Sequence, residues 1–331
     1  MAASSLDVVG IGNALVDVLA RTDDAFLHAQ GLVKGTMALI DSARAESLYA
    51  LMGSGIEMSG GSAANTIAGL ASLGGRGAYI GKVRNDQLGA VFAHDLRAIG
   101  VRFDTPASTE GPATARCLVL VTSDAQRTMN TYLGACVELG PGDIDQRLVA
   151  SAAVTYLEGY LFDPPQAMAA FRRAAEFAHG AERKVSLTLS DPFCVERHRA
   201  DFRDFVHNHV DVLFANEIEI CSLFETKDFD AAARAVRGEC EIAVLTRSAK
   251  GSVVVTRQDT VAVPAAPVAE VVDTTGAGDL YASGFLYGLT HGRDLDACAR
   301  LGSLCAAEII SHIGARPESP LKDLAAKAGL I

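Results

Sequence analysis

The residues best suited to chemistry are the seven at 273–279, Asp-Thr-Thr-Gly-Ala-Gly-Asp, which directly precede an apolar run at 280–289. Small residues let the backbone approach a ligand closely, and the N-terminus of the following helix adds the positive end of its dipole. We therefore expect an anion such as a phosphate to be bound by the backbone of Gly276, Ala277 and Gly278. Asp279 would stand beside that anion as a carboxylate that accepts a proton from an attacking hydroxyl. A glycine-rich turn alone is most often a plain connection, but the carboxylates at both ends of this one favour phosphoryl transfer.

The elements that must position these residues alternate along the chain. Strand-like runs at 8–11, 78–80, 153–157, 184–189, 212–214 and 243–246 are separated by helical patterns, such as those at 63–73, 91–99 and 167–178. This alternation predicts an α/β fold with a central, mostly parallel β-sheet flanked by helices. A further helix is expected from Leu295 to Ile309, with Gly314 as its stop.

Two stretches interrupt this alternation, one within about 15–45 and one within about 105–135. Strand-like runs at 115–121 and 127–132 are bounded by turn residues, which favours a small accessory β-sheet inserted into the main domain. We predict that residues 1–331 form a single α/β domain and that these inserted strands act as its lid. A closed lid excludes water, which would otherwise compete for a transferred group.

Composition excludes several classes of protein. The chain has 40 acidic and 29 basic residues, a net charge of −11 and no basic block, which argues against nucleic acid as a partner. No run approaches the length of a membrane span, and the first residues lack a basic signal region, so we expect a cytoplasmic protein without membrane contact. The seven cysteines include no C-x-x-C pair and indicate reduced thiols. We expect a monomer or a homodimer.

Polar residues near the first strand form a candidate site for the substrate. Asn13 and Asp17 follow that strand, and Asn65 lies in a helix that begins after Gly60 and Gly61. If these residues meet at the carboxyl edge of the sheet, Asp17 and Asn65 provide acceptors for adjacent hydroxyls, and a glycine N–H provides a donor. Other nucleotide motifs are absent, because the glycine-rich run at 10–15 lacks the third glycine of a dinucleotide site and Gly81-Lys82 lacks the rest of a P-loop.

Four motifs together resemble the ribokinase-like (PfkB) family of sugar and nucleoside kinases. They are DTTGAGD at 273–279, GGSAAN at 60–65, VGIGNALVD at 9–17 and GKVRNDQLG at 81–89. The resemblance covers nearly the whole chain, and the small departures at Leu280 and Tyr281 affect helix packing. It implies the ribokinase-like fold with its lid, ATP as phosphate donor, Mg²⁺, and small-molecule acceptors. It also implies that Asp17, Gly61 and Asn65 hold a sugar ring.

For the phosphate donor, the resemblance points to two further segments. Asn216 to Glu219 matches an N-x-x-E element, in which Glu219 with Asn216 would order Mg²⁺ through water. The TRSAKG segment at 246–251 is similar to a loop that lines the ATP phosphates. The ATP-binding residues are therefore expected to be Asn216, Thr246, Ser248, Gly251, Thr274, Gly276 and Gly278. Residues 311–316 and the segment after Asp273 are a candidate site for a monovalent cation such as K⁺.

Within the family, the stretches at 126–129, 187–193 and 211–217 most resemble adenosine kinases, which implies transfer to the 5′-hydroxyl of adenosine to give AMP and ADP. A nucleoside base needs an apolar slot. Its candidate lining residues, each individually more typical of plain core, are Met37, Leu39, Met129, Tyr160 and Phe193. Arg127 is expected either to pair with Asp124 or to contact the transferred phosphate, and the second role is preferred. A sugar kinase of the same family, such as a ribokinase or fructokinase, and a non-catalytic nucleoside- or sugar-binding regulator remain as alternatives.

Overall fold

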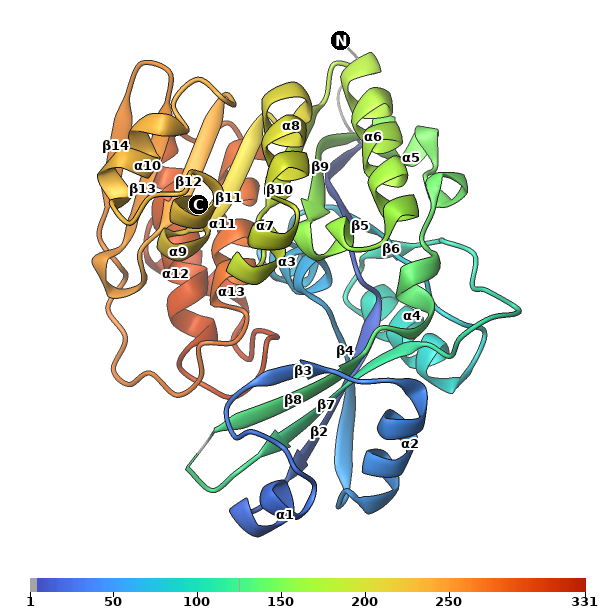
Figure 1. Ribbon diagram of the computed structural model, residues 1–331. Helices are drawn as coiled ribbons and strands as arrows, with labels where there is room; N and C mark the ends of the chain where they lie inside the picture. The colour runs from blue at the N-terminus through green and yellow to red at the C-terminus, as the bar shows by residue number, and fades with distance from the viewer. Residues whose placement is uncertain (1–4, 125) are drawn as a thin grey trace.

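The computed structural model describes residues 5–124 and 126–331 and contains two β-sheets, a larger one above and a smaller one below in Figure 1. The larger sheet has nine strands in the order β14-β13-β12-β11-β10-β9-β1-β5-β6. Its parallel strands are β1 (Leu6–Ile11), β5 (Gly77–Ile80), β6 (Arg102–Phe103), β9 (Ala152–Glu158), β10 (Lys184–Thr188), β11 (Val212–Asn216) and β12 (Ile242–Thr246). Strands β13 (Ser252–Thr256) and β14 (Thr260–Val263) extend one edge in antiparallel fashion.

Helices cover both faces of the larger sheet, because successive strand residues point to opposite sides and both sides are apolar. Along β1, Val9 and Ile11 join one core cluster and Val8 joins the other. On the first face lie α5 (Gln146–Ser151), α6 (Pro165–Gly180), α7 (Pro192–Arg197), α8 (Arg199–His209), α9 (Glu217–Leu223) and α10 (Phe229–Ala235). On the second lie α3 (Ser62–Ser72), α4 (Gln87–Ala98), α11 (Ala277–Thr290), α12 (Leu295–Ile309) and α13 (Leu321–Lys327).

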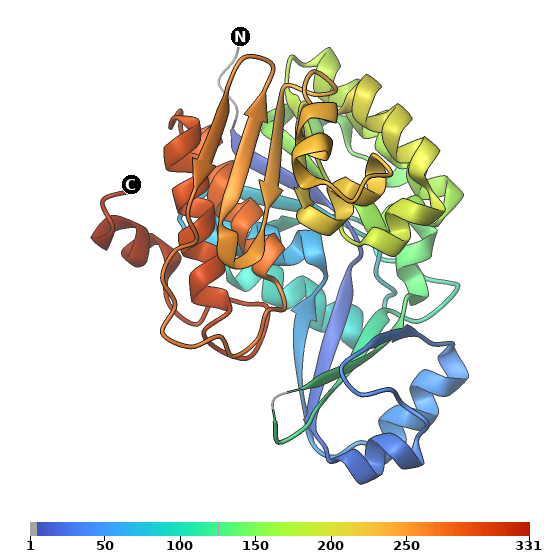
Figure 2. The same cartoon turned by 60° about the vertical axis from the view of Figure 1, so that its left-hand side comes forward.

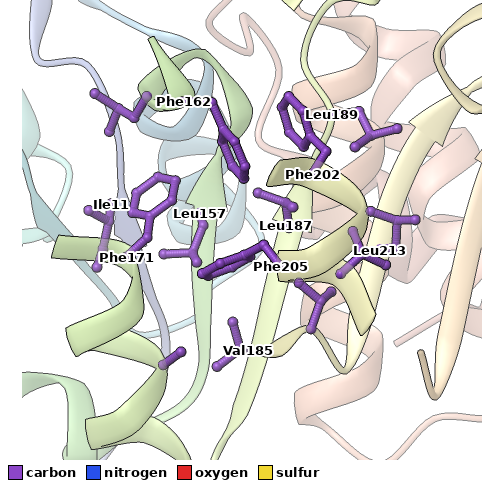
Figure 3. Packing of buried hydrophobic residues seen from close by; sticks show 14 of the residues in the cluster. Ile11, Leu157, Phe162, Phe171, Val185, Leu187, Leu189, Phe202, Phe205 and Leu213 are labelled. Atoms are coloured by element: carbon purple, nitrogen blue, oxygen red, sulfur yellow. The ribbon is translucent and has the colours of Figure 1, made fainter. Parts of the chain in front are cut away.

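The first face is packed largely by aromatic rings. Figure 3 shows Phe171 of α6 and Phe205 of α8 over the strand residues Leu157 and Leu187. Large rings remove much apolar area from water, so this layer fixes the strands whose carboxyl ends carry polar residues.

The smaller sheet has five strands in the order β3-β8-β7-β2-β4, which are β3 (Met37–Leu39), β8 (Arg127–Tyr132), β7 (Ala115–Val121), β2 (Leu15–Arg21) and β4 (Gly55–Gly60). Its outer face packs on α1 (Asp24–Ala29) and α2 (Ser42–Leu51) through a cluster that contains Leu27, Leu48 and Leu118. Figure 2 shows these helices on the side of the small sheet that faces away from the large one. The opposite face is turned toward the carboxyl edge of the large sheet.

The predicted α/β fold with a mostly parallel sheet and a second, smaller sheet is confirmed. Strands β7 and β8 have the expected bounds, whereas β4 lies outside the two stretches that we expected to supply the small sheet. Gly314 is not the stop of α12, which ends at Ile309, and lies in the loop that follows. All seven cysteines are unpaired. Within 5–124 and 126–331, no helix is both long and apolar enough to cross a membrane.

Candidate active site

A cavity of about 710 Å³ lies between the small sheet and the carboxyl edge of the large sheet. In parallel α/β sheets ligands bind at this edge, and the volume is typical of small-molecule sites. Strand ends at Asn13, Glu158, Thr188, Asn216 and Thr246 line the cavity. The sequence thus places one polar group after each of several buried strands, and the sheet brings them together.

The inner face of the small sheet forms the opposite wall, because strand pairing aligns residues in rows across it. One row runs through Leu39, Thr131, Cys117 and Asp17. The next includes Met37, Met129 and Val119. All of these residues line the cavity, and apart from Thr131 and Asp17 they are apolar. Arg127, at the start of β8, adds a charged group to the same wall.

The glycine-rich turn has an unusual backbone at its centre. Gly276 adopts a φ of 78°, a left-handed conformation that suits glycine, and it directly precedes α11. The N–H of Ala277 donates to the carbonyl of Thr274 at 3.2 Å and is therefore engaged within the turn. In this structure it is not free to bind an anion, contrary to our expectation for Ala277. The N–H groups of Gly278 and Asp279 have no acceptor among the described residues, because the first turn of a helix leaves its donors free. Two free donors at a helix N-terminus, on the cavity wall, suit an anion.

Asp279 faces the same cavity and is held by hydrogen bonds from α3. Its Oδ1 accepts from Ser62 Oγ at 2.6 Å, and its Oδ2 accepts from Asn65 Nδ2 at 3.0 Å. Burial raises the pKa of Asp279, while these two hydrogen bonds and the charge of Arg316 lower it in part. The carboxylate is therefore a somewhat stronger base than an exposed aspartate.

Asp17 lies on β2 of the small sheet, so it reaches the cavity from the other side and not from the end of β1 as we expected. Burial raises the pKa of Asp17 to about 6, and Arg316 and Arg127 oppose that rise. Gly60 does not line the cavity, but a Cβ there would collide with the carboxylate of Asp17. The glycine provides the space in which that carboxylate lies.

The N-terminus of α3 joins the two sides of the site. Gly61 has a φ of 100°, and a Cβ at this position would collide with the carbonyl oxygen of Asn13. Asn65 is buried, and its Oδ1 has no hydrogen-bond partner within the described chain although its Nδ2 is used by Asp279. A buried acceptor without a donor beside the cavity fits a ligand hydroxyl.

Glu158, at the end of β9, is a site residue that the sequence analysis missed. Its carboxylate accepts from Asn13 Nδ2 at 2.7 Å and from the N–H of Ala63 at 2.9 Å. Burial raises the pKa of Glu158 to about 7 in spite of these bonds. The available signal was an acid directly after a buried strand, the same signal that identified Asn13 and Asn216.

Arg127 joins the small sheet to the glycine-rich turn. Its Nη2 lies 2.7 Å from Asp273 Oδ2, both side chains are 8% exposed, and Arg127 lines the cavity. The N–H of this nitrogen does not point at the carboxylate, so the contact is an ion pair without a good hydrogen bond, and Nε is also unpartnered. Asp124, the alternative partner, pairs with Lys34 at 2.8 Å.

Asn216 and Glu219 form a reciprocal cap at the start of α9. Asn216 donates from its backbone N and Nδ2 to the two oxygens of Glu219, at 2.8 and 2.6 Å. Burial raises the pKa of Glu219 to about 7, and the neighbouring Asp191 adds to the rise. Within the described residues no cluster of three or more His, Cys, Asp or Glu could hold a metal directly. The donor set instead fits a magnesium ion that keeps its waters and is bound mainly by phosphates.

Of the segment at 246–251, only Thr246 lines the cavity. Ser248 lies in a short 3₁₀ turn, η4 (Ser248–Lys250), and Gly251 follows it with a φ of 84°. A Cβ on Gly251 would collide with the carbonyl of Val263. The structure therefore gives Gly251 a part in the β12–β13 connection, outside the cavity wall.

The apolar candidates do gather at the cavity, which is lined by Met37, Leu39, Met129, Tyr160 and Phe193. Leu39 and Phe193 are 59% and 67% exposed, which is unusual for large apolar side chains of one cavity. These side chains fit a flat apolar ligand group that would cover them.

The lining is otherwise acidic. Among the described residues, eight acidic or basic side chains line the cavity, and two of them, Arg127 and Arg197, are basic. The acids are Asp17, Glu158, Asp163, Asp191, Glu219 and Asp279. Like charges at this density favour bound cations, and the charge of Asp279 adds to the rise in the pKa of Asp17, Glu158 and Glu219.

The two segments proposed to share a monovalent cation site lie against each other. Val272 N donates to Ile310 O at 2.8 Å, and Gly314 N donates to Asp273 Oδ2 at 3.2 Å. A Cβ on Gly276 would lie 3.1 Å from Ala315. The loop after α12 thus supports the glycine-rich turn, and a K⁺ ion there stays a prediction.

Comparison with known proteins identifies the family. The model of the pfkB family carbohydrate kinases matches residues 43–322. Over 330 residues, 93% of this chain and 95% of the relative, the sequence is 28% identical to adenosine kinase of Saccharomyces cerevisiae. The solved adenosine kinase from Sinorhizobium meliloti is 52% identical with a TM-score of 0.92 and covers 98% of this chain and 100% of its own.

A solved probable sugar kinase from Rhizobium etli CFN 42 is 50% identical with a TM-score of 0.93 and covers 99% and 100% of the two chains. The family match spans most of the sequence, and the glycine-rich turn with its carboxylate lies inside it. The chain therefore belongs to the pfkB family of carbohydrate kinases and is a phosphotransferase.

Proposed function

We propose that the protein transfers the γ-phosphoryl group of MgATP to the 5′-hydroxyl of adenosine, giving AMP and ADP. The observation that carries the proposal is one cavity lined by both polar and apolar groups. The polar side chains of Asp17, Asn65 and Asp279 share it with the apolar side chains of Met129 and Phe193, as a ribose joined to a purine requires. The relatives from Sinorhizobium meliloti and Saccharomyces cerevisiae, both described as adenosine kinases, support this choice of acceptor.

In this proposal the acceptor is held by groups from both sheets. The carboxylate of Asp17 accepts hydrogen bonds from the ribose hydroxyls, and the free Oδ1 of Asn65 accepts another. Gly61 brings its backbone close to the same ring because it has no side chain. The base lies against Met37, Leu39, Met129, Tyr160 and Phe193.

Asp279 orients the 5′-hydroxyl and accepts its proton. The transition state of phosphoryl transfer is loose, so the proton leaves late, and positioning and electrostatics contribute most of the rate. The free N–H groups of Gly278 and Asp279 donate to the transferred group, and Arg127 neutralises its charge. Arg127 exchanges its contact with Asp273 for the phosphate in this step.

Two residues would hold magnesium through water, Glu219 with Asn216, and the ion would supply positive charge on the phosphates of ATP. Thr246 and Thr274, which both line the cavity, contact the phosphates in the proposed complex.

The decisive experiment measures ADP formation by the purified protein with adenosine, inosine, guanosine, ribose and fructose, each with and without magnesium. The highest kcat/KM with adenosine is expected, and no turnover is expected without an acceptor. A preference for ribose or fructose would overturn the acceptor and leave the kinase chemistry intact.

A sugar kinase is the second candidate, favoured by the probable sugar kinase from Rhizobium etli. A free sugar would leave the exposed Leu39 and Phe193 without a partner, which is why adenosine is preferred. The non-catalytic binding protein that the sequence left open is not proposed, because the chain belongs to a kinase family and Asp279 lies in the cavity.

A further inference from the structure

We propose that Arg316 is a positioning residue of the acceptor site, which fixes the segment from Ser59 to Ala64 against Asp17 and Asp279. The inference rests on the proposed function for its kinetic readouts. Arg316 lies in the loop after α12, is absent from the cavity wall, and so acts through other groups.

The guanidinium binds both ends of one short segment. Its Nε and Nη2 donate to the carbonyl of Ser59 at 3.1 and 2.9 Å, and Nη2 also donates to Ser59 Oγ at 3.1 Å. Its Nη1 donates to the carbonyl of Ala64 at 2.7 Å. Ser59 is also held from the other side, because its N–H donates to Asp95 Oδ2 of α4 at 2.8 Å.

The segment between these ends carries the functional contacts. Gly60 gives space to the carboxylate of Asp17, and Gly61 lines the cavity. Ser62 donates to Asp279, as does Asn65 one residue beyond Ala64. A planar fork that binds both flanking carbonyls fixes the distance between them, which a lysine cannot do.

The charge of Arg316 has a second effect. Burial lowers the pKa of Arg316 to about 10, so it stays protonated at neutral pH; Asp17, Tyr79, Asp279 and Asp95 face it. The titratable and charged groups around Asp17 are Arg316, Arg127 of β8, Cys117 of β7 and Asp279 of α11. Arg316 is the largest charge that counteracts the burial of Asp17, so it helps keep that acceptor ionised.

Two variants separate the geometry from the charge. R316K keeps the charge without the fork, and R316Q removes both. The matched control is R97Q, since Arg97 also donates from Nε and Nη2 to a backbone carbonyl, that of Phe103, at 3.2 and 2.7 Å, outside the cavity.

Both Arg316 variants are expected to raise the KM for the acceptor about tenfold, because the segment that holds Gly61 and Asn65 loses its charge-assisted hydrogen bonds, while the KM for ATP stays within about twofold. The pH below which kcat/KM for the acceptor falls should be higher in R316Q than in the parent, and unchanged in R316K. R97Q lowers the melting temperature only. An unchanged acceptor KM together with an unchanged pH dependence of kcat/KM in R316Q, or equal changes in R97Q, overturns the proposal.

A direct titration keeps the test independent of the acceptor. In protein labelled with ¹³C at aspartate carboxyls, the resonance that D17N removes should titrate near pH 6 in the parent and at higher pH in R316Q. If no acceptor is phosphorylated, the proposed function fails and this titration still decides the role of Arg316. An identical titration of Asp17 in the parent and in R316Q overturns the proposed role of Arg316.

Discussion

Replacing Asp279 by Asn removes the proposed base while it conserves the shape of the side chain. In the parent, the two carboxylate oxygens accept from Ser62 Oγ at 2.6 Å and from Asn65 Nδ2 at 3.0 Å. An Asn at this position keeps its oxygen toward Asn65 and turns its NH₂ toward Ser62, whose hydroxyl can rotate to accept. The substitution therefore preserves both contacts and abolishes proton acceptance.

The loss of rate follows from the removal of a general base. Such a change lowers kcat by about 10²- to 10⁴-fold, or about 3–5 kcal/mol in the activation free energy. Stability should change in the other direction. Because burial raises the pKa of Asp279, the folded state binds the proton more tightly than the unfolded state, and stability falls as pH rises above the ordinary carboxylate range. The neutral amide removes that loss, so the melting temperature at pH 7 is expected to be unchanged or higher.

The assay combines initial rates of ADP formation, calorimetric binding of an ATP analogue, and melting temperatures from pH 5 to 8. D7N is the matched control, since Asp7 is buried away from the cavity and accepts from Arg76 N and Nη2 at 2.8 and 2.6 Å. D7N should lower the melting temperature and preserve kcat, the opposite pattern. Turnover of D279N within about tenfold of the parent would refute Asp279 as the base, and a melting-temperature loss as large as that of D7N would refute the burial argument.

Three further substitutions test other parts of the site. G61A should destabilise the protein by about 1–3 kcal/mol or more, because φ is 100° and the added methyl meets the Asn13 carbonyl; an unchanged denaturation midpoint would contradict this. In the parent, kcat/KM for the acceptor should fall below about pH 6, where Asp17 takes up a proton, and this fall should be absent in D17N. The free energy of unfolding of the parent should decrease as pH rises from about 4 to 6, because the folded pKa of Asp17 exceeds its ordinary value of 3.8. R127Q should lower kcat about 10²-fold with an unchanged KM for adenosine, whereas a selective rise of that KM would place Arg127 on the acceptor.

The parts of the fold that follow a local pattern could be predicted from the sequence. The strands at 115–121 and 127–132 have the expected bounds because turn residues end them, and α12 begins at the expected Leu295. Strand β4 (Gly55–Gly60) was missed because it reads Gly-Ile-Glu-Met-Ser-Gly, with weak β-propensity, and is formed by pairing with β2. Gly314 was mistaken for a helix stop, although α12 ends earlier, where the chain turns toward Asp273.

In the candidate site, too, residues in a local motif could be predicted from the sequence, whereas residues that depend on distant contacts could not. Asp279 and the glycine turn were predicted from their spacing, and the structure gathers them in one cavity with Asp17 and Asn65, whereas their roles stay a prediction. Glu158 and Arg316 were missed, since their importance depends on contacts with residues far away in the sequence. The partner of Arg127 was also hidden, because Asp124 is its neighbour along the chain and Asp273 its neighbour in space.

The surplus of carboxylates in the cavity bears on how turnover ends. In the proposed reaction, an uncharged nucleoside would enter a pocket whose six acids outnumber two arginines without meeting repulsion. It would leave as a phosphate monoester with nearly two negative charges at pH 7. Without the positive charge that magnesium would supply, the ionised acids among them would repel the newly charged monoester. The cavity that admits the neutral nucleoside would thus disfavour binding of its phosphate monoester. Product inhibition should therefore weaken as pH rises and ionic strength falls.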